Sequence, residues 1–414
     1  IEVEKYFAVP GQDLVLRWLA PEKDGLAGID STMAKCSADA ARLMHRRRNA
    51  NECFGACNKD DNPWQLSGGD IKWYTDWLAV RGVNLFIPHA FYYSIRGKRK
   101  DERPPDVGPH SIWWAHYDAW STYWRRLSWL MTDIDLHAEA AVLCRNRDLC
   151  PDTVRPLFER QIGFQYIPES YFPACTVEDG ALWLHGHRYT AVLGDKALFP
   201  DAAHPEVSAL EPDCRCDPPQ PMLRCAYFNK EGRACWLLVN EGNTPIKTRL
   251  TLPVDAPLCR YDLWNGQPCA CPAERTAKGA CLPLELPARG SLLLFTCTAR
   301  ESEALPLPPT YLSLAAPAFS LADEDAAHLT KTYRATLQIT ATELQTATPL
   351  LTLPGQEMAE LTVNGQPAGV SFWPPHKFPL AGLLTPGENA LTLTLTGSPA
   401  NRYGKHPVPY GLER

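Results

Sequence analysis

The side chains with the clearest chemical potential lie at the ends of two neighbouring strand-like segments. Glu52 closes the polar segment 49–55 and His89 closes the apolar segment 82–89, and an amphipathic helix is predicted between them over residues 70–80. A strand, a helix and a second apolar strand in such close succession predict a βαβ unit. The carboxyl ends of parallel strands are where α/β barrels gather their catalytic groups. We therefore expect both side chains to face one common hollow.

Amide and aromatic side chains accompany this pair along the chain. Asn51 precedes Glu52, Trp64 lies on the following loop, and Tyr92 follows His89. Aromatic rings stack on the apolar face of a pyranose, and amides bond its hydroxyls. A carboxylate meets the oxocarbenium-like charge of glycoside cleavage. The pattern therefore favours a sugar-cleaving site, while a solvated or capping carboxylate is the structural alternative for Glu52.

This segment resembles the seventh and eighth βα units of clan A glycoside hydrolases. The resemblance rests on the glutamate-ended strand, the tryptophan-bearing loop, the helix with Asp70-x-Lys72-Trp73-Tyr74, and the strand 82–89. It is greatest to the multidomain enzymes of families 2, 35, 42 and 106. In families 35 and 42 the seventh-strand glutamate is the nucleophile, which implies that role for Glu52. The Asn51-Glu52 pair also resembles the fourth-strand acid/base of clan A, and we prefer the seventh strand because the barrel pattern ends soon after His89.

Two further residues complete the predicted site. Asp30 ends a presumed sixth strand, where it could bond a sugar hydroxyl or cap the helix that follows Ser31. Trp113 begins an aromatic helix predicted over residues 113–131, whose stripe is typical of core packing, so only Trp113 and Trp114 are expected near the site. No metal-ligand spacing is visible, and we predict neither a cofactor nor a metal.

Residues 1–135 have room for only half of a barrel. Four βα units can be placed there, whereas a complete (β/α)8 barrel needs about 250 residues. We expect the first half of the barrel, with the general acid, upstream of Ile1. On that hypothesis the chain alone would not hydrolyse a glycoside.

Three more domains are predicted, which makes the fold class α/β plus all-β. Residues 136–215 resemble the small flavodoxin-like α/β domain of family 42, which implies a homo-oligomer contact. Residues 221–300 alternate as an antiparallel β-sandwich, with turn pairs between the strands. Residues 305–414 carry Val363-Asn364-Gly365, which resembles the signature of the jelly-roll, galactose-binding-like domain of family 2 enzymes. Asn-Gly also predicts a tight hairpin turn.

Composition limits the classes of partner. A net charge of −6 gives no electrostatic case for nucleic acid or an anionic membrane, and no apolar run of 18 residues is present. The basic clusters 45–48 and 96–100 are short and are interpreted as solvated faces. The fifteen cysteines lack zinc-knuckle spacing, so free thiols in a reducing compartment, the cytoplasm, are expected.

The sequence thus predicts a glycoside hydrolase fragment that acts on an oligosaccharide or glycoside of a plant or host glycan, with retention of configuration. Glu52 would be the nucleophile, His89 would orient it or bond the sugar, and the lining would come from Asn51, Trp64, Tyr92 and Trp113. One alternative is an inverting enzyme resembling family 106, with carboxyls about 6.5–9.5 Å apart instead of about 5–5.5 Å. The other is a non-catalytic sugar-binding or assembly protein with an inert barrel remnant.

Overall fold

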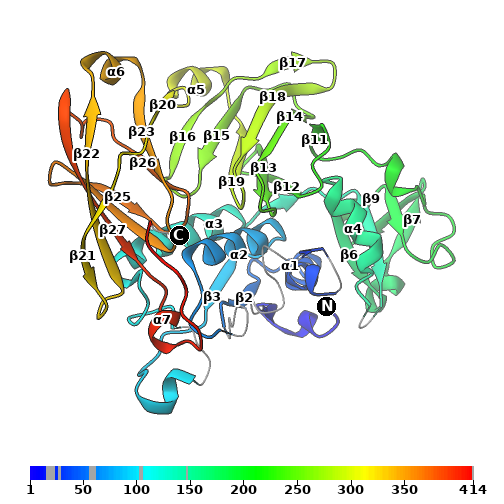
Figure 1. Ribbon diagram of the computed structural model, residues 1–414. Coiled ribbons are helices and arrows are strands. Elements are labelled where there is room, and N and C mark those ends of the chain that lie inside the picture. The colour runs from blue at the N-terminus through cyan, green and yellow to red at the C-terminus, as the bar shows by residue number, and fades with distance from the viewer. Residues whose placement is uncertain (15–23, 27–28, 56–61, 102–105, 146–147, 413–414) are drawn as a thin grey trace. The chain divides into compact units, whose positions relative to one another are not determined.

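The structure is a computed structural model that describes residues 1–14, 24–26, 29–55, 62–101, 106–145 and 148–412. The chain divides into two compact units. Figure 1 labels their helices and strands. Unit 1 comprises residues 1–53, 73–87 and 119–307, and unit 2 comprises residues 54–72, 88–118 and 308–414. We describe each unit by itself. Among the described residues, no helix is both long and apolar enough to cross a membrane.

The first sheet has three strands in the order β1-β2-β3. They are β1 (Gly11–Asp13), β2 (Ala50–Cys53) and β3 (Leu85–Pro88). Strands β1 and β2 run parallel, and helix α1 (Met33–Leu43) lies between them in the chain. Helix α2 (Gly68–Val80) follows β2, at nearly the bounds predicted from the sequence. These described strands do not close into a barrel, and the half-barrel remains a prediction.

One sequence expectation about this sheet is wrong. Asp30, predicted to end a strand, lies in the 3-10 helix η2 (Ile29–Ser31) directly before α1. Asp, Ser and Thr side chains favour helix starts because their oxygens accept from free backbone N–H groups. The run Asp30-Ser31-Thr32 therefore lies at the start of a helix.

A small α/β region follows in unit 1. Strands β5 (Ala140–Cys144), β6 (Phe164–Pro168) and β10 (Ala191–Leu193) form a parallel sheet in the order β10-β5-β6. Every residue of β5 and β6 is buried, as expected for parallel strands covered on both faces. Around this sheet lie α4 (Pro151–Glu159), η5 (Glu169–Ala174), η6 (Val207–Ala209) and the hairpin sheet of β7 (Thr176–Glu178), β8 (Ala181–Leu184) and β9 (His187–Tyr189).

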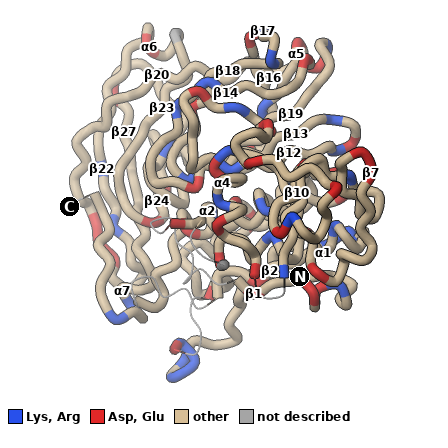
Figure 2. Tube along the Cα trace, turned by 90° about the vertical axis from the view of Figure 1, so that its right-hand side faces the viewer, with Lys and Arg blue, Asp and Glu red and all other residues tan. Residues whose placement is uncertain are grey.

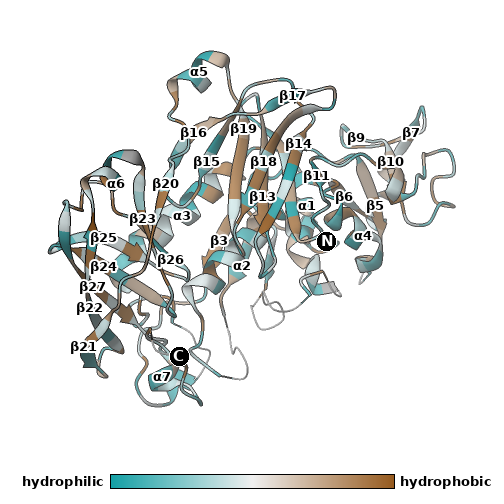
Figure 3. Cartoon of the chain, turned by 45° about the horizontal axis from the view of Figure 1, so that its top comes forward, coloured by the Kyte–Doolittle hydropathy of each residue, from teal (hydrophilic) through white to brown (hydrophobic). Residues whose placement is uncertain are grey.

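The rest of unit 1 is a two-sheet β-structure with a common apolar core that includes Trp236, Leu250 and Leu294. Its sheets have the orders β16-β15-β19-β13-β12-β4 and β11-β14-β18-β17. Neighbouring strands in both sheets are antiparallel, as predicted for residues 221–300. Figure 3 shows the hydrophobic colour concentrated on β13, β14, β18 and β19. The strands are β4 (Asp135–Leu136), β11 (Arg215–Asp217), β12 (Leu223–Lys230), β13 (Arg233–Asn240), β14 (Ile246–Leu252), β15 (Leu258–Asp262), β16 (Gln267–Cys271), β17 (Glu274–Thr276), β18 (Gly279–Leu286) and β19 (Ser291–Thr296).

Unit 2 also contains two sheets, in the orders β21-β22-β27-β24-β25 and β20-β23-β26. The predicted Asn-Gly hairpin joins β24 to β25: Val363 pairs with Gln366, and Asn364 and Gly365 both have positive φ. The strands are β20 (Tyr311–Leu314), β21 (Ser320–Asp325), β22 (Thr330–Ile339), β23 (Thr348–Leu353), β24 (Met358–Val363), β25 (Gln366–Ser371), β26 (His376–Pro379) and β27 (Gly387–Thr396). The remaining helices of the chain are distributed over both units. They are η1 (Glu4–Tyr6), α3 (Tyr117–Leu130), α5 (Ala299–Ala304), α6 (Ala341–Thr346), α7 (Ala400–Tyr403), η3 (Gly97–Asp101) and η4 (Trp114–His116).

Candidate functional site

Two carboxylates lie side by side at the carboxyl ends of β1 and β2 in unit 1. The parallel register pairs Gly11 with Ala50 and Asp13 with Glu52. Register partners on neighbouring parallel strands project to the same face, and the strands themselves lie about 4.8 Å apart. Asp13 is exposed and Glu52 is half-buried. The fold thus places a second carboxylate next to the predicted catalytic glutamate.

The side chains of this pair have no partner in the part of the chain that the structure describes. There, neither Glu52 nor Asp13 takes part in a side-chain hydrogen bond or ion pair, and the backbone oxygen of Glu52 accepts from the Leu14 N–H at 3.2 Å. A carboxylate that served a structural purpose would cap a helix or pair with a cation. Within the described residues Glu52 does neither.

Asn51 lies on the opposite face of β2 from Glu52, because successive strand residues alternate. The side chain is fully buried, and its Nδ2 donates to the Glu52 carbonyl oxygen at 3.0 Å. Its Oδ1 is also buried and accepts from no described group. An orphaned buried acceptor is uncommon in folded proteins and indicates a missing donor, such as a water or a hydroxyl.

Three other predicted site residues come together in unit 2. Trp64 is 1% exposed, and its Nε1 donates to the carbonyl oxygen of Lys100 at 3.0 Å. The ring of Tyr92 lies edge-on to the rings of both Trp64 and His89, with centroid separations of 6.2 and 6.4 Å. Tyr403 packs against the other side of Trp64 at 5.1 Å. This His89 cluster (Trp64, His89, Tyr92 and Tyr403) is therefore tightly packed.

His89 itself carries an unsatisfied group. Its Nδ1 is buried and has no hydrogen-bond partner among the described residues. The ring is packed so closely that a Cβ added at Gly55 would lie 3.1 Å from the His89 Cγ. A side chain at position 55 would press on the imidazole, which would have to shift by a few tenths of an ångström. The orphaned nitrogen suits a ligand hydroxyl or a water.

A buried carboxylate fixes the loop that carries Tyr92. Asp106 accepts from the backbone N–H groups of Tyr92 (3.2 Å), Gly108 (2.7 Å) and His110 (3.0 Å), and it also contacts the His110 Nδ1. Because three backbone donors converge on one side chain, the loop after β3 has a defined shape. Sequence reasoning missed Asp106, although its place in a proline-rich loop was visible.

The exposed aromatic surface of this loop differs from the one predicted. Trp113 is 3% exposed, whereas Trp114 is 42% exposed and Phe91 is 56% exposed. The rings of Phe91, Trp114 and Tyr117 contact one another, with centroid separations of 5.2 to 5.9 Å. Trp114 is thus the better placed tryptophan for stacking on a sugar.

The predicted residues fall into both units. Asn51, Glu52 and Asp30 belong to unit 1, and the residues of the His89 cluster and Trp113 belong to unit 2. A common hollow for Glu52 and His89 therefore remains a prediction.

Among the described residues, no group of three His, Cys, Asp or Glu side chains is arranged to hold a metal ion. Acidic and basic residues are interspersed along the chain (Figure 2).

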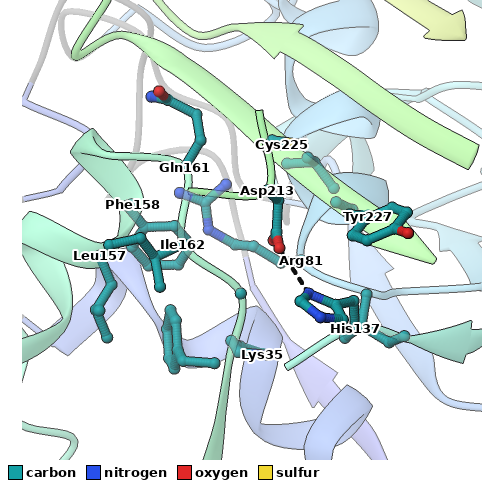
Figure 4. A pocket seen from close by; sticks show the side chains of 15 residues that line it. Lys35, Arg81, His137, Leu157, Phe158, Gln161, Ile162, Asp213, Cys225 and Tyr227 are labelled. Atoms are coloured by element: carbon teal, nitrogen blue, oxygen red, sulfur yellow. Dashed lines mark hydrogen bonds and ion pairs between the residues drawn. The ribbon is translucent and has the colours of Figure 1, made fainter. Parts of the chain in front are cut away.

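A small, partly open cavity of unit 1 is lined by a histidine–aspartate pair (Figure 4). The His137 Nδ1 lies 2.6 Å from the Asp213 Oδ1. This hydrogen bond raises the pKa of His137. The cavity volume is about 30 Å³, which is room for about one water molecule. The cavity is too small for a sugar, so we assign this pair a structural role.

Comparison with known proteins finds similarity in structure and none in sequence. No family model and no curated protein sequence matches the chain. A rhamnosidase from Novosphingobium sp. PP1Y superposes with a TM-score of 0.68 at 13% identity, over 96% of this chain and 48% of that one. A family 42 β-galactosidase from G. stearothermophilus aligns over 71% of this chain and 60% of that one, at 10% identity, but its TM-score of 0.44 is too low to support an argument. The chain therefore shares the fold of part of a glycosidase and spans about half of the rhamnosidase's length.

Proposed function

We propose that this chain is part of a glycoside hydrolase and that Glu52 and Asp13 are its two working carboxylates. The carrying observation is the Asp13–Glu52 register at the carboxyl ends of parallel strands, with neither side chain engaged by another described residue. The fold shared with a rhamnosidase supports the same class of reaction. This assignment replaces the general acid expected upstream of Ile1 with a residue of the chain itself.

In the proposed mechanism Glu52 attacks the anomeric carbon while Asp13 protonates the departing glycosidic oxygen. The Glu52 carboxylate then holds the sugar as a glycosyl ester. Asp13, now ionised, takes a proton from water, which displaces Glu52 and releases the sugar with retained configuration. Retention needs the two carboxyl groups about 5–5.5 Å apart, a separation that side chains of register partners on neighbouring strands can reach.

The His89 cluster supplies the sugar-binding part of the proposal. The His89 Nδ1 would bond a sugar hydroxyl, whereas Asn51 Oδ1, on the face of β2 opposite Glu52, would accept from a water. The exposed ring of Trp114 would stack on a pyranose.

A second candidate function is an inverting, rhamnosidase-like hydrolysis. The TM-score of 0.68 to a rhamnosidase favours it. In that reaction Glu52 would activate a water as base, and the acid would be a more distant carboxylate. NMR of the first-formed product decides between them: the anomer of the substrate indicates retention, and the opposite anomer indicates inversion.

The test uses the chain with aryl and alkyl glycosides of rhamnose, galactose and glucuronic acid. Asp13→Asn should lose most activity on alkyl glycosides and little on activated aryl glycosides, because a good leaving group needs no acid. Glu178→Gln is the matched control, since Glu178 ends β7 in the same unit, is exposed and has no described partner. Equal loss on both leaving groups would remove Asp13 as the acid. Sugar binding without turnover would favour the non-catalytic alternative.

A further inference from the structure

The strands β15 and β19 bring two cysteines of unit 1 into contact. These strands pair antiparallel, with Leu258 opposite Thr296 and Cys259 opposite Phe295. Cys297 directly follows β19, and its N–H continues the ladder by donating to the Pro257 oxygen at 2.9 Å. Residues two apart on an extended strand project to the same face. Cys297 is therefore the diagonal cross-strand neighbour of Cys259.

The two sulfur atoms are too close for a simple packing contact. The Cys259 Sγ lies 2.6 Å from the Cys297 Sγ. Non-bonded heavy atoms pack favourably at about 3.5–4.0 Å, and a disulfide bond is about 2.05 Å long. The backbone thus presents the two thiols at a separation that a small side-chain rotation converts into a bond.

We propose that Cys259 and Cys297 form an intrachain disulfide bond. The two thiols lose two electrons and two protons and gain one S–S bond. The electron acceptor is a disulfide of a small-molecule or protein oxidant, which leaves as two thiols after a mixed-disulfide intermediate. The bond would close the chain between positions 38 residues apart and would tie β15 to the segment that leads into α5.

The surroundings determine when this bond would form. Cys259 is fully buried and Cys297 is 8% exposed. Burial, together with the neighbouring Cys297 thiol, raises the pKa of Cys259 to about 12. The thiolate is the reacting species, so exchange in the folded protein is slow. The disulfide would therefore form while the strands pair and would then be shielded from reductants.

A disulfide between Cys259 and Cys297 would indicate an oxidising compartment. Disulfides of this kind persist where oxidants are present and not in a reducing cytoplasm. It therefore opposes the compartment that the cysteine-rich composition predicted. It does not depend on the proposed hydrolase activity.

The test is a thiol count and a peptide map of the full chain. The chain is refolded with oxidised and reduced glutathione, alkylated under denaturing conditions and weighed, and it contains 15 cysteines. We expect 13 alkylated cysteines before reduction and 15 after it, with one linked peptide that contains Cys259 and Cys297. Alkylation of all 15 without reduction, or a link to a different cysteine, overturns the proposal.

Two variants sharpen the result. Cys259→Ser should abolish the linked peptide. Cys235→Ser should retain it, because Cys235 is equally buried and also pairs with Phe295 but lies on the other neighbouring strand, β13. The oxidised wild type should melt several degrees above the reduced wild type, and this difference should vanish in the Cys259→Ser protein. An unchanged difference in that variant would contradict the proposed pair, and the peptide map of the wild type needs no variant to fold.

Discussion

The carboxylate pair of unit 1 and the His89 cluster of unit 2 differ in how far their side chains are held by neighbouring residues. The Asp13 and Glu52 side chains are free of described partners, although the backbone that holds them is paired in register. The His89 cluster packs ring against ring, with Trp64 buried and the other three residues half-buried, and it leaves one ring nitrogen unsatisfied. The difference suggests a division of work, in which one region supplies reacting groups and the other supplies shape and a hydrogen bond. Substitutions in the first should therefore change turnover, and substitutions in the second should change stability or substrate affinity.

The largest expected effect comes from Glu52. Glu52→Gln should lower kcat by at least about 10⁴-fold, or roughly 5.5 kcal/mol, because the amide cannot form the glycosyl ester. Sugar affinity, measured by calorimetry with a non-hydrolysed analogue, should stay within a few-fold of the wild type. An unchanged kcat would show that the carboxylate pair takes no part in the mechanism. The proposed contrast between this pair and the His89 cluster would then fail.

Trp64 tests whether the His89 cluster is a packed core. Trp64→Ala should lower the free energy of unfolding by about 3–5 kcal/mol, since the ring is 1% exposed and its Nε1 is hydrogen-bonded. Trp114→Ala is the matched control: its ring is 42% exposed. That variant should lose under about 1 kcal/mol of stability and should raise KM several-fold. Denaturant titrations compare the two, and equal losses of stability would contradict the distinction.

His89 should have an intermediate effect. His89→Gln removes the ring and its orphaned nitrogen, and we expect kcat/KM to fall about 10- to 100-fold, a loss of about 1.4–2.7 kcal/mol for one hydrogen bond to substrate. His110→Gln serves as the control, because that imidazole is engaged by Asp106. A loss confined to thermal stability in His89→Gln would indicate a packing role alone.

The same contrast explains what the sequence could reveal. The apolar run of β3 and the Asn364-Gly365 turn are strong local signals, and both elements were predicted. Asp13 was missed because β1 is the three-residue segment Gly-Gln-Asp, which has no hydrophobic alternation. Asp13 matters because it pairs in register with Glu52 on the neighbouring strand. Such long-range pairing cannot be predicted from a local sequence pattern.

The two tryptophans before α3 show a second limit. Trp113 and Trp114 are adjacent and identical in type, and their exposure depends on where the helix starts. The 3-10 helix η4 begins at Trp114, which turns Trp113 inward and leaves Trp114 exposed. The sequence shows that a tryptophan lies at this point of the chain. Which of the two rings faces solvent depends on the residue at which the helix begins.

The smallest expected effect comes from the His137–Asp213 pair of unit 1. Its carboxylate, unlike that of Glu52, has a described partner. The pKa of His137 is raised in the folded state by its bond to Asp213, so the pair stabilises the fold fully below the ordinary pKa of about 6.5. That contribution is lost as the pH rises through the raised pKa. His137 is 40% exposed at its side chain, so solvent screening keeps the effect under about 1 kcal/mol. The wild type should therefore exceed His137→Asn in denaturation midpoint by more at pH 6 than at pH 9, and an equal difference at both would show that the bond does not depend on the proton.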